Sequence, residues 1–280
     1  MGLRIALDLR PGQQPRWARA LAGALQAAGA EHEWLTDPRT WKTADLVLAL
    51  TGARPRFGPP AWTAVHEPRT GWGAAWTARQ SERLLAPSDL VAGVLHTYLR
   101  VPAHRIVRLP PVVPEGFKRA RRPEVEAFRQ RHGLPDRWLA ALAPHPASAA
   151  GLPVFPVYEI PDAELPAAYS GAVAALDPHP RRGNPSGVLE AMACGAPAVV
   201  VAGSAGGEVI ADAGVLVAAG DRQGWLAAIE FLVHDQQERN RLAARALRTG
   251  ERFRAEVAAR RLLAELGAAA RAGTRAAGAG

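Results

Sequence analysis

The chain has 280 residues, of which 48% are hydrophobic and 21% are charged, and it contains one cysteine. This composition excludes collagen-like, fibrous and disordered classes, and the length favours about two domains. The lone cysteine, Cys194, cannot form an internal disulfide, so we expect a cytoplasmic protein in a reducing compartment.

The formal net charge is +8, but Lys42 and Lys118 are the only lysines among the 34 basic residues. Because the chain is also rich in alanine, glycine and proline, we interpret part of its arginine content as compositional bias. Basic residues are not interleaved with aromatic ones as in single-strand binders, so we expect no nucleic-acid partner. The opening MGLRIALD is too short for a signal peptide. Peripheral contact with an anionic membrane through the arginines stays open.

The first half of the chain alternates short apolar runs with segments of helical spacing. Strands are expected at 4–10, 46–50, 62–66, 84–86 and 105–109, and helices at 17–28, 73–83 and 89–99. Strands that alternate with helices predict a mostly parallel, doubly wound sheet.

A proline-flanked basic stretch at 110–135 interrupts this pattern and contains one expected helix that ends at Gly133. Alternation then resumes. Strands are expected at 138–143, 154–158, 173–176, 198–202 and 215–218, with helices from 162, from 185 and three over 221–266, and a frayed tail from 267. We therefore divide the chain into an N-terminal Rossmann-like domain (1–115), a linker and helix (116–135), and a C-terminal domain that includes the last helices (136–280).

The most informative segment is RRGNPSGVLEAMACGAPAVV at 181–200. Asn184 suits the N-cap of a helix and Pro185 its first position, while Ser186 and Gly187 keep the first turn small enough for a ligand to approach. Unpaired amides and the helix dipole at such a start attract an anion, typically a phosphate. Glu190 follows in the second turn, within reach of a sugar diol. An ordinary capped helix with a solvated glutamate is the alternative from spacing alone.

The same residues carry a family resemblance. GVLEAMACGAPAVV and the later GGEVIADAGVLVAAGD resemble the donor-binding half of family 4 glycosyltransferases, which are retaining enzymes of the glycosyltransferase B fold. RIALDLRPG and TAVHEP resemble the first half of that family more loosely. The resemblance implies an α/β protein of two Rossmann-like, doubly wound domains that face a cleft, with the acceptor against the first and the donor in the second. It also implies a nucleotide-sugar substrate, a saccharide or lipid-linked acceptor, and no cofactor or metal.

The resemblance also assigns roles to individual residues. Glu190 falls at the second glutamate of the family's E-x7-E motif. This glutamate binds the ribose of the donor. His66 matches the histidine that touches the transferred sugar, and Gly12 lies in the loop that approaches the phosphates. Backbone around Gly187 would face the diphosphate. The full set for the donor is Gly12, Arg181, Gly183, Gly187, Val188, Leu189 and Glu190, and the catalytic candidates are His66 and Arg182.

Three departures from the family concern the chemistry. Arg182 replaces the first glutamate of E-x7-E, the diphosphate-binding Arg and Lys are absent from APHPASAAGL, and a helix, strand and helix are missing between Ala143 and Val154. The second domain is therefore expected to be reduced. We interpret Arg181 and Arg182 as a replacement source of positive charge. The alternative is a catalytically inactive relative that binds a sugar, a nucleotide or a protein.

Other candidate residues have ordinary explanations. His145 and His179 lie in proline-rich loops without ligand spacing, so no metal site is expected. The aromatic residues Phe57, Trp72 and Trp76 are interpreted as domain packing, with stacking on an acceptor sugar as the alternative.

Overall fold

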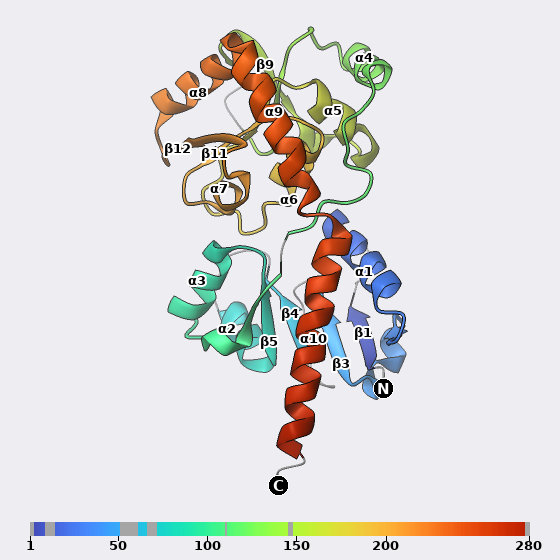
Figure 1. Cartoon of the computed structure of the whole chain (residues 1–280). Coiled ribbons are helices and arrows are strands. Elements are labelled where there is room, and N and C mark those ends of the chain that lie inside the picture. The colour runs from blue at the N-terminus through green and yellow to red at the C-terminus, as the bar shows by residue number, and fades with distance from the viewer. Residues whose placement is uncertain are drawn as a thin grey trace. The chain divides into compact units, whose positions relative to one another are not determined.

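The computed structural model describes residues 3–8, 15–50, 61–65, 72–109, 111–144 and 148–277. The chain forms two compact units, one built from Met1–Val112 with Arg254–Gly280 and the other from Val113–Phe253 (Figure 1). Within these described ranges, no helix is both long enough and apolar enough to pass through a membrane.

The first unit is built on a wholly parallel six-stranded sheet in the order β2-β1-β3-β4-β5-β6. The strands are β1 (Arg4–Asp8), β2 (Glu33–Leu35), β3 (Leu46–Ala49), β4 (Ala61–Ala64), β5 (Arg83–Ala86) and β6 (Ile106–Arg108). The helices are α1 (Arg16–Ala28), α2 (Trp72–Gln80), α3 (Asp89–Thr97) and α10 (Ala255–Ala277), with short 3-10 turns at Pro38–Thr43 and Ala103–Arg105. The five strands and three helices predicted in this half are confirmed. The three-residue strand β2 was not predicted, because EWL is too short to form a pattern.

Helix α10 completes the core of the first unit, where it packs against α1 (Figure 1). Leu262 and Leu266 are buried in one cluster with Leu21 and Leu25 of α1. The predicted C-terminal domain of 136–280 instead included this helix, because spacing shows an apolar stripe but not its distant partner. The helix also continues to Ala277, where a frayed tail was expected, in keeping with the high helix propensity of alanine.

The second unit has a six-stranded sheet in the order β12-β11-β10-β7-β9-β8, parallel except for the β8–β9 pair. The strands are β7 (Leu139–Ala141), β8 (Ser148–Ala149), β9 (Leu152–Pro156), β10 (Ala174–Asp177), β11 (Ala198–Val201) and β12 (Gly214–Val217). The helices are α4 (Arg122–Arg131), α5 (Leu165–Gly171), α6 (Ser186–Ala193), α7 (Ala205–Ile210), α8 (Arg222–His234) and α9 (Gln236–Glu251), with 3-10 turns at Val157–Glu159 and Asp162–Glu164. Together with the first unit, this confirms the predicted α/β class with two parallel, doubly wound sheets.

The connection between β7 and β9 is short. In this stretch the described residues hold only the two-residue strand β8, and β7 pairs directly with β9 in parallel, with Leu139 opposite Val154. The predicted reduction of the second domain is therefore seen as a sheet without a helix-strand-helix insertion among the residues described here.

Helices α6 and α9 pack closely in the second unit, and one glycine allows their approach. A Cβ atom added at Gly250 of α9 would lie 2.8 Å from the Cα and 2.9 Å from the Cβ of Ala193. Because the nearest atom belongs to the backbone of α6, a side chain at this position would push the two helices apart.

We expect Gly250→Ala to lower the free energy of unfolding by about 1–3 kcal/mol through this overpacking. Urea denaturation of the full chain measures the change. Gly23→Ala is the matched control, because a Cβ at this exposed position of α1 meets nothing within 4 Å. In a helix interior that substitution should be neutral or stabilise by up to about 1 kcal/mol. Equal effects of the two variants would contradict the packing argument.

Candidate functional site

The carboxyl ends of β7 and β10 lie next to each other at one edge of the second sheet. The two strands pair in parallel with Ala141 opposite Leu176, and the chain continues from them to opposite sides of the sheet, toward β9 and toward β11. Such a topological switch point is where open α/β sheets bind ligands. Leu142 follows β7 at this edge, and Asp177 is the last residue of β10.

Arg182 connects these two strand ends. Its Nη2 donates to the backbone carbonyl of Leu142 at 3.3 Å, and its Nε lies 3.5 Å from Oδ2 of Asp177. The side chain of Asp177 is only 4% exposed, whereas that of Arg182 is 36% exposed. The guanidinium is therefore held at the switch point while part of it stays accessible to solvent.

The carboxyl group of Asp177 is strongly affected by its surroundings. Burial raises its pKa, while the positive charge of Arg182 and the backbone amide of His179, which donates to Oδ1 at 3.3 Å, lower it. The charge of His179 also lowers it, but burial outweighs all of these effects, so the pKa of Asp177 is raised overall. The ionised form of Asp177 depends on Arg182 as its nearest compensating charge.

Helix α6 begins immediately after this loop. It starts at Ser186 with Pro185 in the cap position, so the helix begins one residue later than predicted. Asn184 still serves its start, because its Oδ1 accepts hydrogen bonds from the amide of Ser186 at 3.0 Å and from its hydroxyl at 2.6 Å. Within the described residues, the amides of Gly187 and Val188 donate to no acceptor. Gly187 is half-buried and Val188 is 1% exposed, so the amide of Gly187 is the one that an anion can reach at this helix start.

The glycine at 187 is explained by packing. A Cβ atom there would lie 3.0 Å from Cδ2 of Leu142, so the small residue lets α6 approach the residue that follows β7. Access for a ligand was the reason predicted for this small residue, and its contact with Leu142 is a second one. Val188 and Leu189 are buried, at 1% and 0% exposure, and the amide of Leu189 already donates to the carbonyl of Pro185 at 3.1 Å. Their predicted contact with the donor remains a prediction.

Glu190 is 1% exposed and interacts within the chain. The alternative of a solvated glutamate is therefore wrong for this structure. Its predicted contact with a ribose is a separate matter and remains a prediction. Cys194, four residues further on, is fully buried in the core of the second unit, as expected of a packing residue.

Some of the remaining site candidates lie among the residues that the structure describes, and others do not. Arg181 is exposed beside Arg182, and Gly183 is buried in the same loop. His66 and Gly12 lie outside the described residues, as does His145. Across the part of the chain that the structure describes, no three His, Cys, Asp or Glu side chains are grouped as a metal site would require.

Sequence reasoning missed the part that Asp177 plays in holding Arg182. The available signal was an acidic residue at the end of a buried strand, five positions before an arginine. It could not reveal that β7 lies beside β10, which brings the carbonyl of Leu142 to the same guanidinium.

Comparison with known proteins gives the class of the fold. A crystal structure of Anabaena HepE in complex with UDP-glucose has a TM-score of 0.70 at 13% sequence identity, covering 95% of this chain and 100% of that one. A glycosyltransferase from Rickettsia africae has a TM-score of 0.71 at 11% identity, covering 94% and 97%. Sucrose-phosphate synthase from Thermosynechococcus elongatus has a TM-score of 0.70 at 15% identity, covering 95% and 100%. The chain therefore has the glycosyltransferase B fold.

One stretch of the second unit matches a known family. Residues 148–249 match the family described as glycosyl transferases group 1. This match confirms the resemblance to glycosyltransferases that the segment 181–200 carries, whereas the narrower assignment to family 4 stays a prediction. Comparison with curated proteins gives no match for the chain.

The coupling between Asp177 and its surroundings predicts a pH effect on stability. Because the folded-state pKa is raised, the buried carboxylate costs stability that increases as the pH rises through this pKa. Asp177→Asn removes the ionisation, so its free energy of unfolding relative to wild type should rise as the pH increases from about 4, near the ordinary pKa of an aspartate, until the raised pKa of Asp177 is passed. Urea denaturation at each pH measures the difference. Asp136→Asn, at a carboxylate that is 90% exposed, is the control. A difference that is constant with pH would contradict the assignment.

Proposed function

We propose that the chain is a retaining glycosyltransferase that moves a sugar from a nucleotide-sugar donor to a saccharide or lipid-linked acceptor. The second unit binds the donor in this proposal, and the first binds the acceptor. The observation that carries the proposal is the position of Arg182, which lies at the switch point of the sheet, in the loop before α6 and inside the matched family segment.

The donor diphosphate is assigned to the start of α6. The unpaired amide of the half-buried Gly187 supplies a neutral donor, and the helix dipole favours negative charge there. Arg182 adds a cation that is already held in place, and Arg181 adds a second on the exposed side of the loop. The UDP-glucose bound to Anabaena HepE, a protein of the same fold, supports a nucleotide-sugar ligand.

The chemical role of these groups is to stabilise the departing nucleoside diphosphate. Charge develops on the phosphate oxygens as the bond to the sugar breaks, and fixed donors aimed at that charge lower the barrier. Arg182 would exchange part of its contact with Asp177 for the phosphate, since its guanidinium has donors on two edges. Glu190 is proposed to accept hydrogen bonds from the ribose. No metal or other cofactor is part of this proposal.

The acceptor is assigned to the first unit, with His66 near the transferred sugar and Gly12 in the loop toward the phosphates. Trp72 and Trp76 lie four residues apart on α2 and are 94% and 43% exposed, so Trp72 is not a packing residue in this structure. Their exposed rings support stacking on a saccharide. For a lipid-linked acceptor, the proposal includes contact with a membrane surface through exposed arginines. It also includes a cytoplasmic location for the protein.

A non-catalytic binding module is the second candidate. Arg182 favours it, because a cation stands where the family has a carboxylate near the reacting sugar. Hydrolysis or transfer measured over a panel of nucleotide sugars separates the two candidates. Turnover supports the enzyme, binding without turnover supports the module, and neither activity nor binding contradicts both.

Arg182→Ala should weaken the binding of a nucleoside diphosphate by about tenfold or more, because it removes a charge-assisted hydrogen bond. Calorimetric titration with UDP, GDP and ADP measures the affinity. The double variant Asp177→Asn/Arg182→Ala removes the buried carboxylate too and guards against misfolding. Arg241→Ala, at an exposed arginine of α9 paired with Glu238, is the matched control. Equal affinities of wild type and Arg182→Ala would contradict the proposal.

Glu190→Gln should weaken nucleoside diphosphate binding by about tenfold while leaving inorganic pyrophosphate binding unchanged, because only the nucleotide carries a ribose. The same titrations provide both numbers, and thermal unfolding reports the structural cost of changing a buried side chain. A variant that loses stability but keeps its affinity for both ligands would show that Glu190 is a core residue and not a ribose contact.

A further inference from the structure

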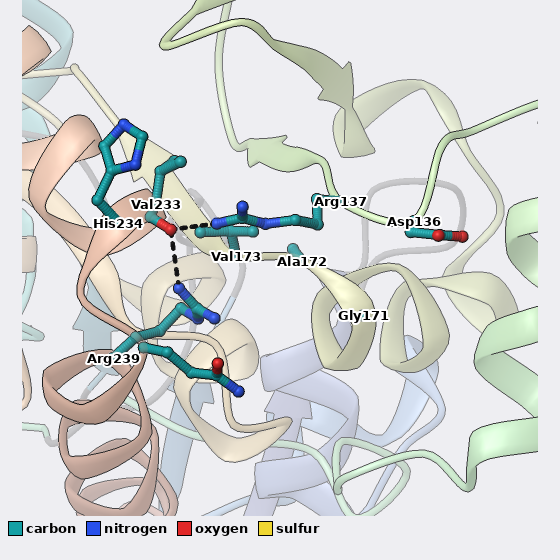
Figure 2. A pocket seen from close by; sticks show the side chains of 9 residues that line it. Asp136, Arg137, Gly171, Ala172, Val173, Val233, His234 and Arg239 are labelled. Atoms are coloured by element: carbon teal, nitrogen blue, oxygen red, sulfur yellow. Dashed lines mark hydrogen bonds between the residues drawn. The ribbon is translucent and has the colours of Figure 1, made fainter.

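A hollow lies in the same unit, at the edge of the sheet opposite the candidate donor site. It has a volume of about 520 Å³, and its walls include Arg137, Ala172, Val173, Val233, His234 and Arg239 (Figure 2). Arg137 precedes β7 and Val173 precedes β10, so the hollow lies where these parallel strands begin. The candidate donor site lies where they end, and the two sites are therefore separate.

Two guanidinium groups converge on the last turn of α8 at this hollow. Arg137 donates through Nη2 to the carbonyl of Val233, and Arg239 donates through Nη1 to the same carbonyl at 3.3 Å (Figure 2). Nη1 of Arg239 also donates to the carbonyl of Leu232 at 2.6 Å. These carbonyls end a 13-residue helix, where the dipole favours positive charge. Helix capping therefore accounts for the position of both arginines.

Capping does not use all of their donors. Within the described residues, Nε and Nη1 of Arg137 and Nε and Nη2 of Arg239 have no acceptor. Each arginine thus keeps one or more N–H groups beyond the bonds that fix its orientation. The hydrogen bonds to α8 already order both side chains. Ligand binding would therefore lose little further conformational entropy in ordering them.

The two positive charges are also poorly compensated. Burial lowers the pKa of Arg239 and the charge of Arg137 lowers it further, while Asp235 opposes these effects. Asp136 also lines the hollow, but its carboxylate is 90% exposed and pairs with Arg129 at 3.2 Å. Like charges held this close favour a bound anion that neutralises both.

We propose that this hollow binds a small molecule that carries a phosphate group, with Arg137 and Arg239 donating to the phosphate oxygens. A phosphate monoester has close to two negative charges at neutral pH and matches two guanidinium groups, whereas a carboxylate has one. The volume is within the range of small-molecule sites. The exposed side chains of His234 and Gln236 stand at the rim for the rest of the ligand. This site goes beyond the proposed function and does not depend on it.

Calorimetric titration of the full chain with inorganic phosphate, at constant ionic strength, tests the site. The parent and all variants carry Arg182→Gln, which weakens phosphate binding at the start of α6 and makes what remains there common to every protein compared. We expect Arg137→Gln and Arg239→Gln each to weaken phosphate binding at least about tenfold. Arg241→Gln, on the same helix α9 but outside the hollow, should leave phosphate binding unchanged.

Titrations with other ligands identify the chemical class that the hollow binds. Acetate at the same concentrations should bind at least about tenfold more weakly than phosphate. Glycerol 3-phosphate and phosphatidylcholine vesicles that contain phosphatidic acid separate a free phosphate ester from a lipid headgroup, and a small-molecule site predicts binding of the former only. Thermal unfolding without ligand shows whether each variant is folded. Absence of phosphate binding in the parent, or equal binding by the parent and the folded Arg137→Gln and Arg239→Gln variants, would overturn the proposal.

Discussion

The second unit depends on how the buried carboxylate at the end of β10 is compensated. Asp177 lies at the centre of the sheet edge, where burial disfavours its ionised form. A buried charge is tolerated when a partner of opposite sign is fixed beside it, and here Arg182 is fixed both by Asp177 and by the carbonyl after β7. The loop before α6 must therefore fold back over the strand ends, and this fold sets where the helix starts.

The short connection between β7 and β9 also bears on which loop supplies the positive charge at this sheet edge. In the family that the sequence resembles, cations for a diphosphate stand after the first strand of the second domain. Here that stretch has no Arg or Lys before β9, and the positive charge comes instead from the loop after β10. Both loops reach the same edge because β7 and β10 are neighbours. Either loop can therefore supply an arginine or a lysine that lies near the same point at the sheet edge.

Local sequence features predicted most of the fold and little of its long-range assembly. Strands and helices with a strong apolar period, such as β3 and α1, were found because the period itself encodes the buried face. The short strand β2 and helix α7 lack such a period. The partner of α10 and the meeting of Arg137 with Arg239 could not be predicted, since each joins segments about a hundred residues apart or more. The start of α6 was predicted to within one residue by Asn184 and Pro185, but the contact of Arg182 with Asp177 and Leu142 required the strand order.

The return of α10 to the first unit has a consequence for biosynthesis. The first unit is assembled from both ends of the chain, so the second unit is topologically an insertion within it. During translation, the whole of Val113–Phe253 leaves the ribosome before Leu262 and Leu266 can cover the apolar face of α1. The inserted unit can therefore complete its folding first. The unit that begins the chain is the last to be finished, and until then its nascent apolar surface is the one a chaperone would meet.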